Sequence, residues 1–153
     1  MRFLLVDQIL ELDPLKRIVT TKKVEPDEDY FADHFPGYPV VPGVLQVEMM
    51  AQSAGKCVMA GIEASKWPVL VQVRQANFRQ IVLPGSSLRI DAEIVSCNSN
   101  TATASAKIWC EDRVVADASL MFGFIQRNLL QSGFQDEVLS EYLGRQTGIA
   151  AGL

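Results

Sequence analysis

The sequence predicts an α+β fold in which an antiparallel sheet packs against one long central helix. Residues 43–62 are apolar on nearly every face, which is typical of a helix that is buried all round. Much of the remaining chain alternates apolar and polar residues with a period of two, which indicates half-buried strands. A helix on one face of an antiparallel sheet is an α+β architecture. The 153 residues suit a single domain.

The first predicted elements are a hairpin and a loop. The apolar stretches 3–12 and 17–24 are separated by Asp13-Pro14, which is a turn signal. Residues 25–41 form a predicted loop, because they contain the breakers Pro26, Pro36, Gly37 and Pro39. The long helix should begin near Pro42, since proline is favoured at the first helical position, where its missing N–H would be unpaired anyway.

Four further strands complete the predicted sheet. They span residues 67–73, 87–95, 101–110 and 114–125. The alternation is clearest in the second and third of these strands, whose apolar faces carry Leu88, Ile90, Ala92 and Ile94, and Ala102, Ala104, Ala106 and Ile108. These strands indicate an antiparallel meander. A sheet of this kind wrapped around a central helix is the hotdog fold, which the pattern permits without requiring it.

The predicted domain covers residues 1–127. Residues 128–153 form a C-terminal extension that is partly helical, with a short helix at 136–143 and a loose tail after it. No internal repeat, low-complexity tract or linker divides the chain.

Charge and composition argue against several classes of function. The formal net charge is -4 and no basic run is longer than Lys22-Lys23, which argues against a nucleic-acid partner. The three cysteines have no CxxC spacing, so we expect reduced thiols without a metal. The N-terminal apolar run stops at Asp7, too early for a signal peptide, and residues 43–62 carry charges that a membrane span avoids. We therefore expect a cytoplasmic protein with no membrane partner.

Two residues near the central helix are candidates for acid–base chemistry. His34 is the only histidine and precedes the helix, while Glu48 lies inside it. Gln52 follows four residues after Glu48, so it shares a helical face with the carboxylate and could orient it. Each residue has an ordinary interpretation too. A single loop histidine is usually a surface or packing residue, and a buried glutamate is often a structural partner, here of Lys56 or an arginine.

Together the two residues suit the removal of water from a 3-hydroxyacyl thioester. Neutral imidazole, with an ordinary pKa of about 6.5, can take the C2 proton near neutrality. A carboxyl group on an apolar helix has its charged form disfavoured, so its pKa should rise and it can act as the acid. The N-terminus of the helix offers unpaired N–H groups to the developing enolate, and Gly43 has no side chain to block close approach.

The residues around this pair resemble a known family. HFPGYPVVPGVL at 34–45, followed by Glu48 and MAQ at 50–52, is similar to the signature of the FabZ-type 3-hydroxyacyl-[acyl-carrier-protein] dehydratases. ANFR at 76–79 and VLPG at 82–85 resemble a later strand and turn of that family. The resemblance covers roughly residues 5–125.

The resemblance implies a hotdog homodimer, or a trimer of such dimers, in which the histidine of one subunit faces the glutamate of the other. It implies that His34 takes the C2 proton and that Glu48 acts on the C3 hydroxyl. Gln52 would support the carboxylate and Gly43 N–H would bind the thioester carbonyl. Other residues implied to support the site are Phe35, Pro42 and Val44.

The resemblance also implies the substrate. The acyl chain would be carried on the phosphopantetheine of an acyl carrier protein, in fatty-acid or related lipid metabolism, and would lie in an apolar tunnel along the helix. No metal or redox cofactor is implied. Glutamate rather than aspartate at position 48 favours the dehydratase-only branch over the dehydratase-isomerases.

Some positions depart from the family pattern. Asp33 replaces a common glycine, and its carboxylate would favour the imidazolium if it came close. Gln46 and Met49 replace small or aliphatic residues. Two common basic residues and a proline are replaced by Asn77, Gln80 and Ile81, which could weaken docking of an acidic carrier protein. The remaining candidates for that contact, or simply solvated surface charges, are Lys66, Arg74 and Arg79.

Other functions stay open at this stage. A hotdog acyl thioesterase or an enoyl-CoA hydratase would share the fold, which by itself does not decide function. A non-catalytic acyl-binding subunit is a third possibility, and the presence of both His34 and Glu48 counts against it.

Overall fold

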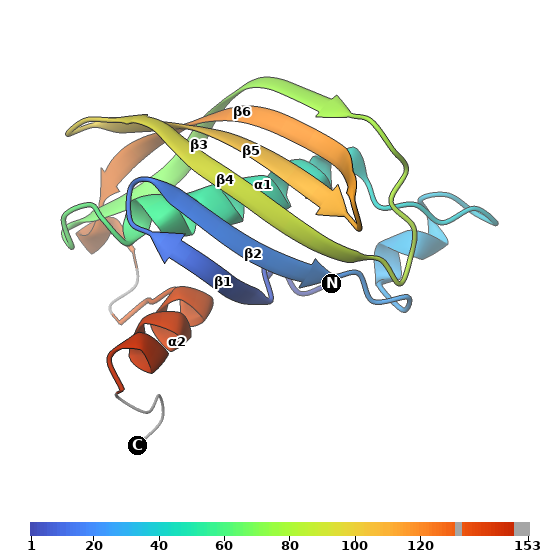
Figure 1. Cartoon of the computed structure of the whole chain (residues 1–153), viewed down its shortest axis with the longest axis horizontal. Coiled ribbons are helices and arrows are strands. Elements are labelled where there is room, and N and C mark those ends of the chain that lie inside the picture. The colour runs from blue at the N-terminus through green and yellow to red at the C-terminus, as the bar shows by residue number, and fades with distance from the viewer. Residues whose placement is uncertain (131–132, 149–153) are drawn as a thin grey trace.

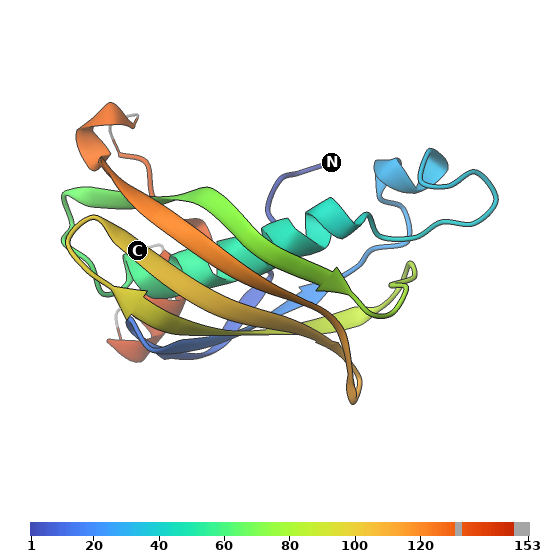
Figure 2. The ribbon, with the colours of Figure 1, turned by 90° about the horizontal axis from the view of Figure 1, so that it is seen from above.

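The computed structural model describes residues 1–130 and 133–148. Within them, six strands form one antiparallel sheet in the order β1-β2-β4-β5-β6-β3, and the long helix α1 lies against its concave face (Figure 1). Viewed from above, the strands run obliquely across the helix (Figure 2). The predicted α+β hotdog fold is confirmed. The elements in chain order are β1 (Gln8–Asp13), β2 (Arg17–Lys23), the 3-10 helix η1 (Asp29–Ala32), α1 (Gly43–Met59), β3 (Lys66–Phe78), β4 (Ser87–Cys97), β5 (Thr101–Cys110), β6 (Arg113–Gln126), the 3-10 helix η2 (Arg127–Leu129) and α2 (Glu137–Gln146).

The strand ends agree with the sequence patterns to within two residues, except at the start of β1 and the end of β3. The predicted first strand, 3–12, is too long, because residues 3–7 precede β1 and place Leu5 and Val6 in the core. The third strand is longer than the predicted 67–73, since β3 continues to Phe78 by pairing with β6 along its whole length. Polar residues interrupt the apolar–polar alternation after residue 73, so the sequence pattern ends although the backbone pairing with β6 continues.

Helix α1 begins at Gly43, next to the predicted start near Pro42. Pro42 is its N-cap rather than its first residue, and the Pro42 carbonyl accepts the backbone N–H groups of Leu45 and Gln46. The helix ends at Met59, three residues before the predicted end. A helix of 17 residues is ~25 Å long, so α1 spans most of the sheet.

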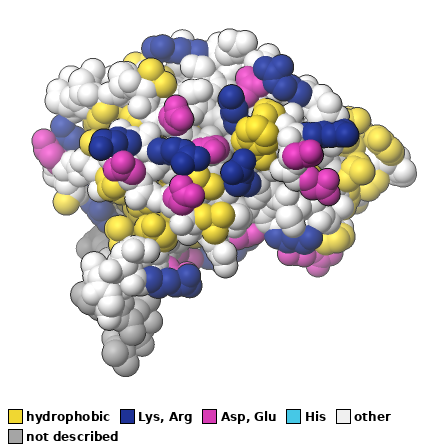
Figure 3. Space-filling view, in the orientation of Figure 1, with side chains coloured by type: hydrophobic (Ala, Val, Ile, Leu, Met, Phe, Trp, Pro, Cys, Tyr) yellow, Lys and Arg dark blue, Asp and Glu magenta, His cyan; other side chains and the backbone are white. Residues whose placement is uncertain are grey.

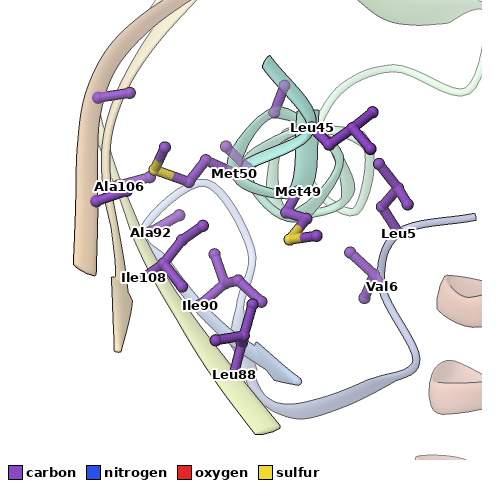
Figure 4. Close-up of a cluster of buried hydrophobic side chains, with 14 of the residues drawn as sticks. Leu5, Val6, Leu45, Met49, Met50, Leu88, Ile90, Ala92, Ala106 and Ile108 are labelled. Carbon is purple, nitrogen blue, oxygen red and sulfur yellow. The ribbon is translucent and has the colours of Figure 1, made fainter. Parts of the chain in front are cut away.

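The core lies between α1 and the inner face of the sheet. The apolar faces predicted for the second and third meander strands are buried, with Ile94 only partly so. Figure 4 shows Met49 and Met50 of α1 pointing toward side chains of β4 and β5, among them Ile90 and Ile108. Removing this apolar surface from water contributes roughly 25 cal/mol per Å² of free energy, which stabilises the helix against the sheet.

The C-terminal extension contains the predicted helix. α2 runs from Glu137 to Gln146, so the predicted end at 143 is wrong by three residues, and residues 149–153 of the predicted tail lie outside the described residues. Asp136 caps the helix by accepting the N–H of Leu139. Val138 and Leu139 pack into the core, and α2 contacts β1. The extension is therefore attached to the domain.

The outer face of the sheet carries mixed charges. Figure 3 shows acidic and basic side chains interspersed over this face rather than one patch of a single sign. No helix within residues 1–130 and 133–148 has both the length and the apolar character to cross a membrane. The three cysteines are unpaired, with Cys57 buried and Cys97 exposed.

Candidate active site

The loop before α1 holds His34 in one orientation. The imidazole Nδ1 lies 3.0 Å from the carbonyl oxygen of Val40. A carbonyl only accepts, so Nδ1 carries the proton and the neutral ring keeps an unprotonated Nε2. The backbone closes the same loop, because Val40 N–H donates to the His34 carbonyl at 2.9 Å. The half-buried ring stacks on Phe35, with centroids 4.1 Å apart. His34 is thus fixed as an acceptor at Nε2.

Glu48 lies on the face of α1 that the sheet does not cover. Its Oε1 accepts a hydrogen bond of 3.0 Å from Nε2 of Gln52, the geometry expected one helical turn away. Gln52 is itself fixed by the N-terminal segment, since its Oε1 accepts the N–H of Leu5 at 2.9 Å and its Nε2 also donates to the carbonyl of Phe3 at 3.2 Å. The second oxygen of Glu48 has no hydrogen-bond partner among the described residues.

The interpretation of Glu48 as half of a structural ion pair is wrong. Within residues 1–130 and 133–148, no cation lies within 4.0 Å of its carboxylate. Lys56 pairs with Asp136 of the C-terminal extension instead. Glu48 is half-buried rather than enclosed. A half-buried carboxylate that only a neutral amide holds is free to exchange a proton with a ligand.

The N-terminus of α1 leaves two donors open. Gly43 and Val44 are its first residues, and their N–H groups form no hydrogen bond within the described part of the chain. The ring of Phe78 covers Gly43 so closely that a Cβ there would lie 3.0 Å from its Cζ. Only glycine therefore lets this ring approach the helix end. Val44 is 75% exposed and Pro42 half-buried.

Gln46 also differs from an ordinary core residue. Its side chain is buried and donates to the carbonyl of Val41 at 3.3 Å. Its Oε1 has no hydrogen-bond partner among the described residues.

A cleft of about 530 Å³ runs along the open face of α1. One helical stripe forms its floor, and it is made of Glu48, Gln52, Gly55 and Met59. The N-terminal segment and β3 form its sides, with Phe3 and Leu4 opposite Trp67, Pro68 and Leu70. The volume and the mostly apolar lining, with a few polar groups, are typical of a small-molecule site.

His34 does not line this cleft. The loop that carries it extends away from the N-terminal end of α1, as Figures 1 and 2 show. No hydrogen bond joins His34 to Glu48 in one chain. The fold therefore separates the two sequence-predicted residues, although each is held in a defined geometry.

The remaining sequence-predicted residues are those of the histidine loop and the basic candidates for the carrier-protein contact. Asp33 is exposed and forms no ion pair with His34 within the described residues, so it does not act on the imidazole through a direct contact. Phe35 is exposed. Of the basic candidates, Arg79 pairs with Asp117 and Lys66 donates to the Ser99 carbonyl at 2.6 Å. Arg74 has no acidic partner in the described part of the chain.

Sequence reasoning missed most of the cleft. Phe3, Trp67 and Phe134 are aromatic lining residues from three distant segments. Lys56 and Asp136, which also line it, are 80 positions apart. No local pattern marks such residues, because only the folded chain brings them together.

Comparison with known proteins gives a consistent family. A family model described as a FabA-like domain matches residues 1–119. The 3-hydroxyacyl-[acyl-carrier-protein] dehydratase FabZ of Desulforamulus reducens is 38% identical over 126 residues, which cover 82% of this chain and 89% of the relative. The FabZ of Fusobacterium nucleatum is 41% identical over 121 residues, covering 78% and 85%.

Solved structures with the same fold are more distant. A thioesterase from Haemophilus influenzae matches with a TM-score of 0.59 at 16% identity, over 81% of this chain and 80% of that one. A hypothetical thioesterase with coenzyme A from Streptococcus pneumoniae matches with a TM-score of 0.61 at 18% identity, over 78% and 85%. At such identities these structures show the shared fold and not a shared reaction.

Proposed function

This chain belongs to the FabA-like family, with FabZ-type dehydratases as its relatives, and on that premise we propose that it removes water from (3R)-3-hydroxyacyl thioesters on an acyl carrier protein. The product is a trans-2-enoyl thioester, as fatty-acid or related acyl-chain biosynthesis requires. One observation carries the assignment of roles. His34 and Glu48 are each positioned by a neutral partner, which leaves Nε2 of the one and a carboxylate oxygen of the other without a partner in the part of the chain that the structure describes.

The proposed chemistry is a concerted or stepwise elimination. The C2–H bond breaks to Nε2 of His34, and the electron pair forms the C2=C3 double bond. The C3–O bond breaks as protonated Glu48 gives its proton to the leaving hydroxyl, which departs as water. The N–H of Gly43 stabilises negative charge on the thioester oxygen, aided by the positive end of the α1 dipole. Proton exchange with water then restores both residues, and the chemistry requires no metal or redox cofactor.

Two subunits would build one site. Within one chain the histidine loop extends away from the Glu48 cleft, so we propose that His34 acts together with Glu48 of the partner subunit. The edge strand β3 supports this assembly. It offers an unpaired backbone edge of 13 residues, on which Leu70, Val71 and Val73 are exposed. Such an edge attracts a second strand, and large exposed apolar patches mark interfaces.

More exposed apolar side chains continue this surface around the start of α1. They are Phe35, Tyr38, Val44, Phe78, Ile81 and Leu83. Pairing of β3 with β3 of a second copy would cover part of this surface through a two-fold contact. Further assembly into a trimer of dimers and a cytoplasmic location stay predictions.

The acyl chain would lie in the α1 cleft. Glu48 sits at one end of the cleft, which places the reacting C2–C3 bond there. From Glu48 to Lys56 the helix rises eight residues, or ~12 Å. The carrier protein would approach from the outer end, where Arg74 is the basic candidate that lacks an acidic partner in the described residues.

Subunit mixing tests the reaction and the shared site together. Purified His34→Ala and Glu48→Gln proteins should each lose hydration of crotonyl thioester. After dissociation and reassembly of an equal mixture, half of the dimers combine the two variants, and each of these has one intact site. Activity should return to about a quarter of the wild-type value. A mixture that stays inactive although mixed dimers form would refute the shared site.

The same assay separates the alternatives. Crotonyl thioesters of the carrier protein and of coenzyme A are compared side by side, with release of free thiol followed in parallel. A dehydratase interconverts enoyl and 3-hydroxyacyl thioesters without releasing thiol. Thiol release without hydration would indicate a thioesterase and would contradict the proposal. Normal hydration by the His34→Ala protein alone would also contradict it.

A further inference from the structure

A short segment of the C-terminal extension crosses the far end of the α1 cleft. Residues 134–137 line the cleft at the end opposite Glu48. The segment lies outside the family match, which ends at residue 119. It also lies beyond β6, the last strand of the sheet, which ends at Gln126.

Three contacts hold the segment, one to the floor of the cleft and one to each of its two sides. Phe134 packs edge-on against Trp67 of β3, with ring centroids 5.0 Å apart. Asp136 accepts a hydrogen bond of 2.8 Å from Nζ of Lys56 on α1. Glu137 pairs with Arg2 of the N-terminal segment at 2.8 Å. The segment is thus attached to the floor and to both sides of the cleft, in the manner of an end wall.

The central contact is a nearly buried ion pair. The side chains of Lys56 and Asp136 are only 4% and 14% exposed. Asp136 serves twice, because its Oδ2 meets Lys56 while its Oδ1 caps α2 through the N–H of Leu139. Breaking a buried pair leaves an uncompensated charge, so the pair holds the wall in place strongly.

The lining of the cleft changes character at this wall. Between Glu48 and the wall the apolar side chains that line it include Phe3, Leu4, Ala51 and Phe122. At the wall, polar and charged side chains are added beside the ring of Phe134, namely Lys56, Gln135 and Asp136. An acyl chain gains free energy while it stays among apolar groups, but a chain end that pushed into the ion pair would desolvate it.

We propose that residues 134–137, held by the Lys56–Asp136 pair, form the end wall of the acyl site and set the longest acyl chain that the enzyme accepts. The inference rests on the proposed function, since it takes the cleft to hold the acyl chain. The ~12 Å from Glu48 to Lys56 then corresponds to a chain of medium length. Longer chains would have to displace the wall.

A series of trans-2-enoyl thioesters of increasing chain length tests the wall. For the wild-type protein, kcat/KM should rise by roughly fourfold per added methylene while the chain fills the cleft, and then stop rising at a break point. In Phe134→Ala the wall loses its contact with β3, so the break point should move to longer chains. The ratio of long-chain to short-chain kcat/KM should rise ~10-fold. Asp136→Asn, which still caps α2 but cannot neutralise Lys56, should shift the break point in the same direction.

A matched control comes from the same extension. Leu143 is exposed on α2 and does not line the cleft, so Leu143→Ala should leave the break point unchanged. A wild-type series without a break point would overturn the proposal. So would a folded Phe134→Ala protein whose break point is unchanged, or whose activity falls equally at every chain length.

A binding measurement distinguishes a failure of the end-wall proposal from a failure of the proposed reaction. Calorimetry with saturated acyl thioesters, which cannot react, measures the same break point without turnover. A break in affinity that moves in Phe134→Ala would support the wall even if the wild-type protein failed to hydrate any enoyl thioester. Affinity that is independent of chain length would overturn the wall whatever the activity.

Discussion

Replacing Gln52 by leucine should separate the positioning of Glu48 from the stability of the fold. The leucine keeps the approximate size of the side chain but removes three hydrogen bonds, to Glu48, Leu5 and Phe3. The largest cost is the N–H of Leu5, a buried residue, because an unsatisfied buried donor costs about 1–3 kcal/mol. Glu48 is half-buried and the Phe3 end exposed, so water replaces much of those two contacts.

The expected destabilisation is about 2–4 kcal/mol in the free energy of unfolding. For a domain of this size, Tm should fall by about 4–15 °C. The effect on turnover should be larger than stability explains. Glu48 loses the donor that orients it, and a misplacement of ~1 Å at a reacting group can cost about 100-fold in rate. We therefore expect kcat for crotonyl-thioester hydration to fall 10- to 100-fold, measured well below Tm.

The neighbouring residue provides the control. Ser53 is buried on the sheet side of α1, where it donates to the Met49 carbonyl and meets the hydroxyl of Thr20 at 2.8 Å. Ser53→Ala should lower the unfolding free energy by about 1–3 kcal/mol while kcat stays at the wild-type value. If Gln52→Leu keeps kcat within twofold of wild type, or if Ser53→Ala loses as much activity, the positioning role of Gln52 is refuted.

Three further predictions follow from single contacts. Gly43→Ala places a Cβ 3.0 Å from the aromatic ring above it, so kcat/KM should fall about 10-fold with Tm nearly unchanged; an unchanged kcat/KM would remove the residue from the thioester site. Burial raises the pKa of Cys57 to about 11, so a thiol reagent at neutral pH should modify exposed Cys97 first, and mass spectrometry that finds Cys57 modified in the native protein would contradict this. The hydrogen bond from Asn77 and the ion pair with Arg79 lower the pKa of Asp117 from 3.8, so its stabilisation is present above the unfolded-state pKa and is lost as pH falls through the lower folded-state pKa. The urea midpoint of unfolding should therefore drop less steeply in acid for Asp117→Asn than for wild type. Equal slopes for the two proteins would show that Asp117 contributes nothing to this pH dependence.

Local signals in the sequence determined the elements and part of the site. The alternation of β4 and β5 and the apolar run of α1 show which faces are buried, and this periodicity can be identified from the sequence alone. The contact of Gln52 with Glu48 was also predictable, because a spacing of four on a helix fixes neighbours without knowledge of the rest of the fold. The signature around His34 indicated the family for the same reason, since the motif is contiguous.

Only the tertiary structure decided what surrounds these residues. The sequence suggested that Glu48 could form a structural pair with Lys56 or an arginine, but Lys56 instead meets Asp136, 80 positions away. The strand order puts β3 at an exposed edge, which no local pattern in its sequence marks. Pairings between distant segments depend on how the chain closes upon itself. No local periodicity encodes that closure, and for this reason the cleft, its end wall and the separation of His34 from Glu48 emerged only from the fold.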